Sequence, residues 1–190
     1  MFQFRVTRAA ALIAVASVLL TASQRSGTNP ADMELVDQDG HTVHFYRDVV
    51  KDRVVAINFI FTSCQTICTI LGAKFAKVDK LLADRHVAKV QLISISVDPA
   101  NDGPEQLRSF AARYGVTQRW KLLTGEKRNV EQLLRSLGEY TPDKTAHTGR
   151  VLIGRGDGNW MRVDGLGSPE KIADLLTTTA AQPSSARSGP

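Results

Sequence analysis

The chain has 190 residues, of which 43% are hydrophobic and 23% charged, and its formal net charge is +5. This length and composition predict a single globular domain with its own core and exclude a wholly disordered chain. Two cysteines exclude a disulfide-rich scaffold and a four-cysteine zinc site, and the small surplus of basic residues, which never form a block of five or six, argues against nucleic-acid binding.

The first 23 residues are typical of an export signal. Arg5 and Arg8 precede an almost wholly apolar run over 9–22, and polar residues follow it. This run is shorter than the ~20 residues that a membrane-spanning helix needs. We therefore expect 1–23 to be a signal peptide or, if it is not cleaved, an N-terminal membrane anchor.

The rest of the chain divides into a short linker, a folded domain and a tail. Residues 24–32 have the composition of a linker, and 181–190 have too little apolar content to fold. Strand-like and helix-like segments alternate between them, over 33–180. The predicted strands are 34–36, 42–45, 54–61, 90–97, 120–123, 151–153 and 160–163, and the predicted helices are 67–82, 104–114, 130–137 and 169–178. This order predicts a three-layer α/β domain with an N-terminal β-hairpin, which turns at Asp39-Gly40.

Both cysteines lie where the strand 54–61 is followed by a helix. Thr62 or Ser63 is available there as the helix cap. The free amides and the dipole of a helix N-terminus stabilise an anion, so a thiolate forms more easily at Cys64 than at an ordinary cysteine. Residues four apart on a helix share one face, so the sulfurs of Cys64 and Cys68 can bind one ligand or form a disulfide.

A purely structural disulfide is the alternative interpretation of this pair. A bridge between Cys64 and Cys68 closes a very short loop, and the stabilisation from a disulfide grows with loop length. A functional pair is therefore the better explanation.

One of the four histidines is a candidate third ligand. His41 and His44 lie on a hairpin where side chains alternate between faces, and His86 lies in a polar loop. His147 directly precedes the strand that begins near Arg150, at an edge of the sheet where strand ends meet. Spacing alone leaves open whether His147 is a ligand or a hydrogen-bonded surface residue.

Four segments, in their order and spacing, resemble the SCO/SenC family. They are the segment 61–68 (FTSCQTIC), the segment 96–107 (SVDPANDGPEQL), the segment 120–125 (WKLLTG) and His147 ahead of a strand. The resemblance covers most of 33–180 and implies a thioredoxin-like (peroxiredoxin-like) domain. It also implies a copper protein, with Cys64, Cys68 and His147 as metal ligands and Asp98 as a supporting residue close to the site.

The resemblance implies that the protein delivers copper. The protein would be a metallochaperone, and its partner would be the copper-bearing subunit of cytochrome c oxidase or another copper-handling protein. It would act as a monomer in the bacterial periplasm, either free or tethered to the inner membrane. The donor set agrees with this, because two thiolates and an imidazole suit Cu(I) and also accept Cu(II), whereas zinc prefers a fourth ligand.

The sequence departs from the family pattern at three positions. Gln65 and Thr69 stand where the family usually has proline after each cysteine, and Ala146 stands where it usually has aspartate. The missing prolines leave the loop freer and add backbone N–H donors, and the missing acid removes a possible contact to the histidine.

An enzyme is the competing hypothesis. A thiol-disulfide oxidoreductase would use Cys64 as the attacking thiolate and Cys68 as the resolving thiol, but it gives His147 no role. A thiol peroxidase is a third possibility, although no Thr-x-x-Cys motif with a nearby arginine surrounds Cys64.

Overall fold

The computed structural model describes residues 32–156 and 159–182. The expected signal segment 1–23, the linker up to residue 31, the tail from residue 183 and two residues of the last hairpin turn lie outside the described residues. In the part of the chain that is described, no helix is both long enough and apolar enough to cross a membrane.

Seven strands form one sheet in the order β2-β1-β5-β4-β3-β6-β7. The central strands β3, β4 and β5 run parallel, and every other neighbouring pair is antiparallel. The strands are β1 (Glu34–Asp37), β2 (Thr42–His44), β3 (Val54–Ile60), β4 (Val90–Ser96), β5 (Trp120–Thr124), β6 (Arg150–Gly154) and β7 (Met161–Asp164). All residues of β3 and β4 are buried, which explains their nearly unbroken apolar sequences.

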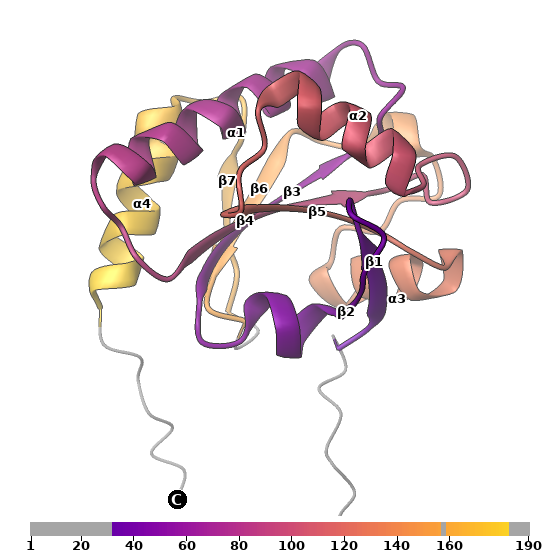
Figure 1. The fold of residues 1–190 in the computed structure, drawn as a ribbon, viewed down its shortest axis with the longest axis horizontal. Coiled ribbons are helices and arrows are strands. Elements are labelled where there is room, and N and C mark those ends of the chain that lie inside the picture. The colour runs from indigo at the N-terminus through magenta and orange to yellow at the C-terminus, as the bar shows by residue number, and fades with distance from the viewer. Residues whose placement is uncertain (1–31, 157–158, 183–190) are drawn as a thin grey trace, which may run out of the picture.

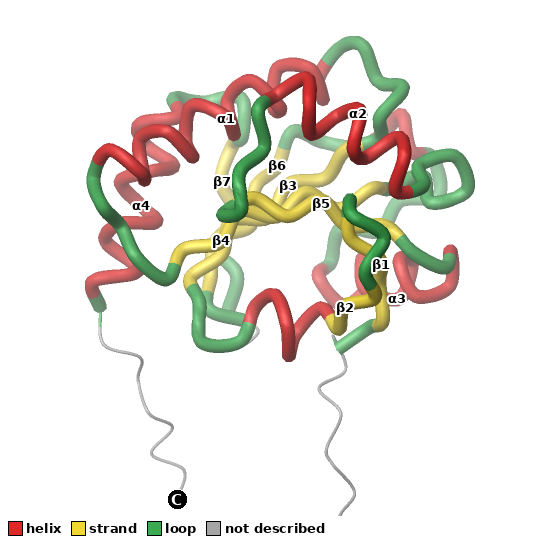
Figure 2. Tube along the Cα trace, viewed as in Figure 1, coloured by secondary structure: helices red, strands yellow, loops and turns green. Residues whose placement is uncertain are grey.

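Helices cover both faces of the sheet (Figures 1 and 2). The helices are η1 (Phe45–Val50, a π-helix), α1 (Ile67–Asp84), α2 (Pro104–Tyr114), α3 (Lys127–Leu137), η2 (Lys144–Ala146, a 3-10 turn) and α4 (Pro169–Ala181). Side chains from α1, α2 and α4 pack on one face of β3 and β4, and those from η1 and α3 pack on the other. The predicted three-layer α/β architecture and its N-terminal hairpin are therefore confirmed.

Most element bounds agree with the prediction to within three residues, and two of the differences have a clear physical cause. Phe45, predicted as the end of a strand, begins η1, because Phe45, Val49 and Val50 are all buried under the sheet at helical rather than alternating spacing. Helix α3 begins at Lys127 instead of Val130, because its first turn is polar and gives no apolar periodicity to detect.

The strand registers bring three connecting segments to one edge of the sheet. Ile60 lies opposite Ser96 in the parallel pair of β3 and β4, so the loops that follow these strands are neighbours. Ile57 lies opposite Leu152 in the antiparallel pair of β3 and β6, so the segment before β6 lies beside the end of β3. Cys64, His147 and both aspartates of the loop after β4 lie in these segments, and Cys68 follows Cys64 in the first turn of the next helix.

Candidate metal and thiol site

The loop between β3 and α1 carries Cys64, and the first turn of α1 carries Cys68. The helix begins at Ile67 with Thr66 as its N-cap residue, so the expectation that Thr62 or Ser63 caps it is wrong. The backbone N–H and the hydroxyl of Thr62 instead donate hydrogen bonds to the carboxylate of Asp102, at 3.0 and 2.6 Å. Thr62, which was expected to cap the helix, therefore attaches the loop after β3 to the loop after β4.

The sulfur of Cys64 accepts the hydrogen bond that a capping side chain would normally accept. The backbone N–H of Cys68 lies 3.4 Å from this sulfur, and the hydroxyl of Thr66 lies 3.6 Å from it. The hydroxyl of Thr69 also donates to the carbonyl of Cys64, at 3.5 Å. Both cysteines are free and buried, 8% and 3% exposed, so in this dithiol form both sulfurs are available as ligands.

The two thiols differ in acidity. Burial on its own raises the pKa of Cys64, but hydrogen bonds from the thiol and backbone N–H of Cys68 and from Thr66 outweigh it, so the pKa of Cys64 falls below that of an ordinary thiol. Burial, as the largest cause, and the hydrogen bond to Cys64 together raise the pKa of Cys68 to about 12. The pair therefore holds its first negative charge on Cys64.

His147 follows the η2 turn and presents an unused nitrogen. Its ring lies 5.3 Å from the ring of Phe59 in β3, and its Nδ1 lies 3.4 Å from the carbonyl of Thr148. Its Nε2 is buried and has no hydrogen-bond partner among the described residues. Burial lowers the pKa of His147, which favours the neutral imidazole that binds metals. An orphaned, buried imidazole nitrogen fits the requirements of a metal ligand.

The loop that carries His147 lies against the start of α1. A β-carbon added at Gly149 would be 3.1 Å from the side chain of Ile67, the residue before Cys68. The ligand atoms of Cys64, Cys68 and His147 do not all lie within 4.8 Å of one another. The three residues therefore share one edge of the sheet without forming a closed cluster.

Asp98 supports the histidine side of this edge. Its carboxylate forms an ion pair with Lys144 of η2 and accepts two hydrogen bonds from Asn101, at 2.9 and 3.0 Å. Its backbone N–H donates to the hydroxyl of Ser96. Asp98 therefore links the loop after β4 to the segment that leads to His147, and no hydrogen bond of the described residues joins it to a cysteine.

Asp102 supports the cysteine side and was not identified from the sequence. It is 1% exposed, and besides the two hydrogen bonds from Thr62 it accepts one from the hydroxyl of Ser96, at 2.6 Å. The sequence offers only an acidic residue shortly before a helix, which is typical of turns. The contact to Thr62, 40 residues away, depends on the pairing of β3 with β4.

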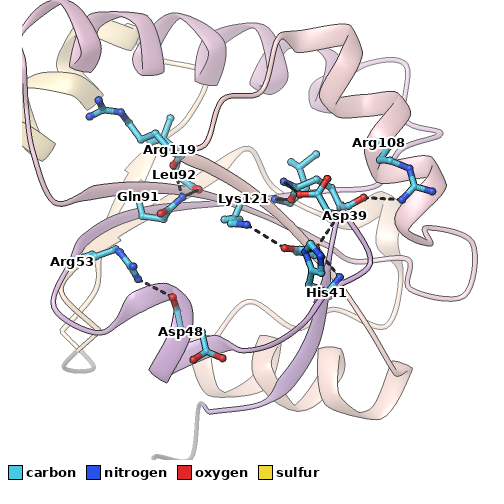
Figure 3. Close-up of polar contacts among 12 residues, drawn as sticks. Asp39, His41, Asp48, Arg53, Gln91, Leu92, Arg108, Arg119 and Lys121 are labelled. Carbon is cyan, nitrogen blue, oxygen red and sulfur yellow. Dashed lines mark hydrogen bonds and ion pairs between the residues drawn. The ribbon is translucent and has the colours of Figure 1, made fainter.

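A second group of possible ligand residues lies at the turn of the N-terminal hairpin (Figure 3). Within the described ranges, only Asp37, Asp39 and His41 bring three such ligand atoms within 4.8 Å of one another. The carboxylate of Asp37 is already used, because one oxygen accepts the backbone N–H groups of Asp39 and His41 and the other pairs with Lys121. These contacts explain the cluster as a turn that holds β1 and β2 together.

The neighbouring pocket has a volume of about 830 Å³ and includes Arg53, Gln91 and Lys121 in its lining. Gln91 and Lys121 lie near the amino ends of the parallel strands β4 and β5, whereas the cysteines follow the carboxyl end of β3. This pocket is therefore separate from the cysteine site.

Comparisons with known proteins agree with the fold. A family model described as SCO1/SenC matches residues 22–181. The SCO1 protein homolog of Bacillus subtilis is 41% identical over 90 residues, which are 47% of this chain and 45% of that protein. A putative copper-binding protein of Stutzerimonas stutzeri is 28% identical over 171 residues, which cover 82% of this chain and 80% of that protein.

A solved structure of a Sco family protein is also similar to this chain. BsSco, described as a member of the Sco family of cytochrome c oxidase assembly proteins with a disulfide switch, superimposes with a TM-score of 0.67 at 28% identity. The match covers 79% of this chain and 92% of that one. The fold is thus thioredoxin-like, as the sequence predicted, and because the family model spans nearly the whole described domain, the chain belongs to the SCO1/SenC family.

Proposed function

We propose that this protein binds one copper ion through Cys64, Cys68 and His147 and delivers it during assembly of cytochrome c oxidase. The observation that carries the proposal is the buried Nε2 of His147, which has no hydrogen-bond partner among the described residues and sits on a loop packed against the first residue of α1. The free thiols of Cys64 and Cys68 supply the other two donors. The name of the Stutzerimonas relative supports copper, and the description of BsSco supports the role in oxidase assembly.

Each proposed ligand would bind in a defined protonation state. The hydrogen bonds around Cys64 favour its thiolate, and burial favours the neutral form of His147. Cys68 has a pKa of about 12, so it would release a proton when the metal binds. Because the three ligand atoms are not gathered within 4.8 Å, binding also requires the loop around His147 to move toward the sulfurs. Such a site can exchange ligands with a partner protein one at a time.

We further propose that the domain over 33–180 acts outside the cytoplasm, in the bacterial periplasm. The support is the signal-like segment 1–23, with its basic start and short apolar run. Fractionation of cells that express the full chain, followed by mass determination of the recovered protein, tests this. Recovery of the uncleaved chain in the cytoplasm would contradict export, whereas loss of about 23 residues or retention in the membrane would support it.

A thiol-disulfide oxidoreductase is the second candidate function. The difference in acidity between Cys64 and Cys68 favours it, because an attacking thiolate needs a lowered pKa and a resolving thiol does not. This function does not use His147. Reductase activity should therefore survive the substitution His147→Ala, whereas copper binding should not survive unchanged.

The deciding experiment is a copper titration of the reduced protein. We expect uptake of one Cu(I) per chain, and with Cu(II) an intense thiolate-to-copper charge-transfer band, because sulfur ligands donate strongly to Cu(II). Cys68→Ala should abolish the band, and His147→Ala should weaken or shift it.

His41→Ala is the matched control. His41 lies at the hairpin turn, 76% exposed in its side chain, and its loss should leave both the stoichiometry and the band unchanged. If the reduced wild-type protein bound no copper but reduced disulfides readily, the oxidoreductase would replace the metallochaperone as the proposed function.

A further inference from the structure

Asp102 makes the side-chain contact that joins the cysteine loop to the rest of the sheet. Its carboxylate accepts hydrogen bonds from the N–H and hydroxyl of Thr62, two residues before Cys64, and from the hydroxyl of Ser96 at the end of β4. Phe61, which precedes Thr62, accepts the backbone N–H of Cys64 at 3.1 Å. A single buried group thus fixes the approach of the chain to the first cysteine.

The burial of this carboxylate makes the contact restrictive. Asp102 is 1% exposed, and the groups that contact its carboxylate directly are the neutral donors of Thr62 and Ser96. Among the described residues it forms no ion pair, and the charge of Lys144 acts on it only from beyond contact distance. Leaving a buried charge without its hydrogen bonds is strongly unfavourable, because no water replaces them. Thr62 and Ser96 are therefore held where the carboxylate needs them, and the loop between Thr62 and Cys64 has little freedom.

We propose that Asp102 is the positioning residue of the cysteine pair: by holding Thr62 it sets how firmly Cys64 and Cys68 bind a thiophilic metal ion and how readily they form a disulfide. The part of this inference that concerns metal binding rests on the proposed copper site. The part that concerns disulfide formation rests only on the two cysteines. The charge of Asp102 also acts on the pair, because it contributes to the raised pKa of Cys68.

Asp102→Asn is the main test. It keeps the size of the side chain but removes its charge and turns one acceptor oxygen into a donor. The amide oxygen can still accept from the N–H of Thr62 and from Ser96, which share one carboxylate oxygen, but the amide nitrogen cannot accept the hydroxyl of Thr62. We expect the affinity for Cu(I), measured by competition with a chromophoric chelator, to fall about 10- to 100-fold, the usual effect of removing a group that orients a metal ligand. In the metal-free protein, the equilibrium with a glutathione redox buffer should shift roughly tenfold toward the dithiol, because a loop that Asp102 no longer holds at Thr62 brings Cys64 and Cys68 less often into the geometry of a disulfide.

Three further variants separate positioning from general stability. Asp79→Asn is the matched control, since Asp79 is also buried and accepts a threonine hydroxyl, from Thr117 at 2.7 Å, but lies far along α1 from the cysteines. It should leave copper affinity and the dithiol equilibrium within about threefold of wild type. Thr62→Val removes one donor and should show a smaller loss of the same kind, whereas Thr62→Ser keeps both donors and should behave as wild type.

The outcomes distinguish this inference from the proposed function. If wild type binds no copper, the copper half fails with the proposed function, and the glutathione equilibrium of the variants still decides the other half. If wild type binds copper and folded Asp102→Asn matches it in both measurements, Asp102 is only a structural residue and the inference is overturned. Should Asp102→Asn not fold, Thr62→Val carries the test, and unchanged values for that variant would overturn the inference in the same way.

Discussion

The sulfur of Cys64 replaces an oxygen at a helix N-terminus. Helices usually begin with Ser, Thr, Asp or Asn because their side-chain oxygens accept an otherwise unpaired amide hydrogen. Here the amide of Cys68 points to the sulfur of Cys64, and Thr66 at the N-cap makes no capping hydrogen bond with its side chain. The helix therefore stabilises negative charge on an atom that can react or bind a metal.

The unequal acidity of the thiols leads to a prediction about alkylation. Treated with limiting iodoacetamide at pH 8, the reduced protein should be modified at Cys64, because a thiol with a pKa of about 12 is then only about one part in 10,000 thiolate. The rate at Cys64 should reach half its maximum at a lower pH than that of a free cysteine, since its pKa is lowered. Peptide mapping by mass spectrometry gives the site and the rate.

Thr66→Val provides the matched comparison for this prediction. It removes a hydroxyl 3.6 Å from the sulfur of Cys64 and leaves the backbone contacts in place. The pH of half-maximal rate should therefore rise, while the order of reaction stays the same. Equal modification of Cys64 and Cys68 at pH 8 would show that the two thiols do not differ as described.

At the scale of elements, the start of α1 shows what the sequence does not reveal. The apolar periodicity predicted a helix from Ile67, and α1 begins there. Residue preference placed the cap at Thr62 or Ser63, but Thr62 bonds to Asp102, a residue that only the folded sheet brings near. The spacing of apolar residues predicts which side chains face the core. Which residue caps a helix depends on the hydrogen-bond partners that the folded chain brings within reach.

Small residues let the loop of His147 approach α1 closely. A β-carbon at Gly165 would lie 2.4 Å from the carbonyl of Gly149 and 2.8 Å from the side chain of Leu71, distances that no real side chain tolerates. The backbone N–H of Gly165 also donates to that carbonyl, at 2.8 Å. The segment after β7 therefore presses the segment before β6, which also carries His147, against the helix that carries Cys68.

At the scale of the whole molecule, local signals predicted the architecture well and the polar network poorly. The buried runs of β3 and β4 and the helical spacing in α1 are visible in sequence because they follow from burial on one face or on both. Asp98 was expected as a supporting residue close to the site, but its partner Lys144 could not be predicted. Asp102 was not expected at all, because hydrogen bonds between distant segments leave no periodic trace.

Glu139 joins three elements of the molecule through one buried carboxylate. It follows the end of α3, and its side chain is 3% exposed between Arg150 of β6 and Arg162 of β7, each 3.2 Å away. The arginines are 41% and 46% exposed, so water screens part of their charge. Glu139→Gln should therefore lower the free energy of unfolding by about 1–2 kcal/mol.

Urea denaturation at equal ionic strength measures this change as a lower midpoint at an unchanged slope. Glu131→Gln is the matched control, because Glu131 lies in α3 and meets Lys127 and Arg135 only at 3.9 Å. Such exposed pairs contribute little, so this control should change the free energy of unfolding by less than about 0.5 kcal/mol. If both variants had the same midpoint, Glu139 would not stabilise the contact between α3 and the hairpin of β6 and β7. The position of β6, the strand that follows His147, would then depend on packing alone.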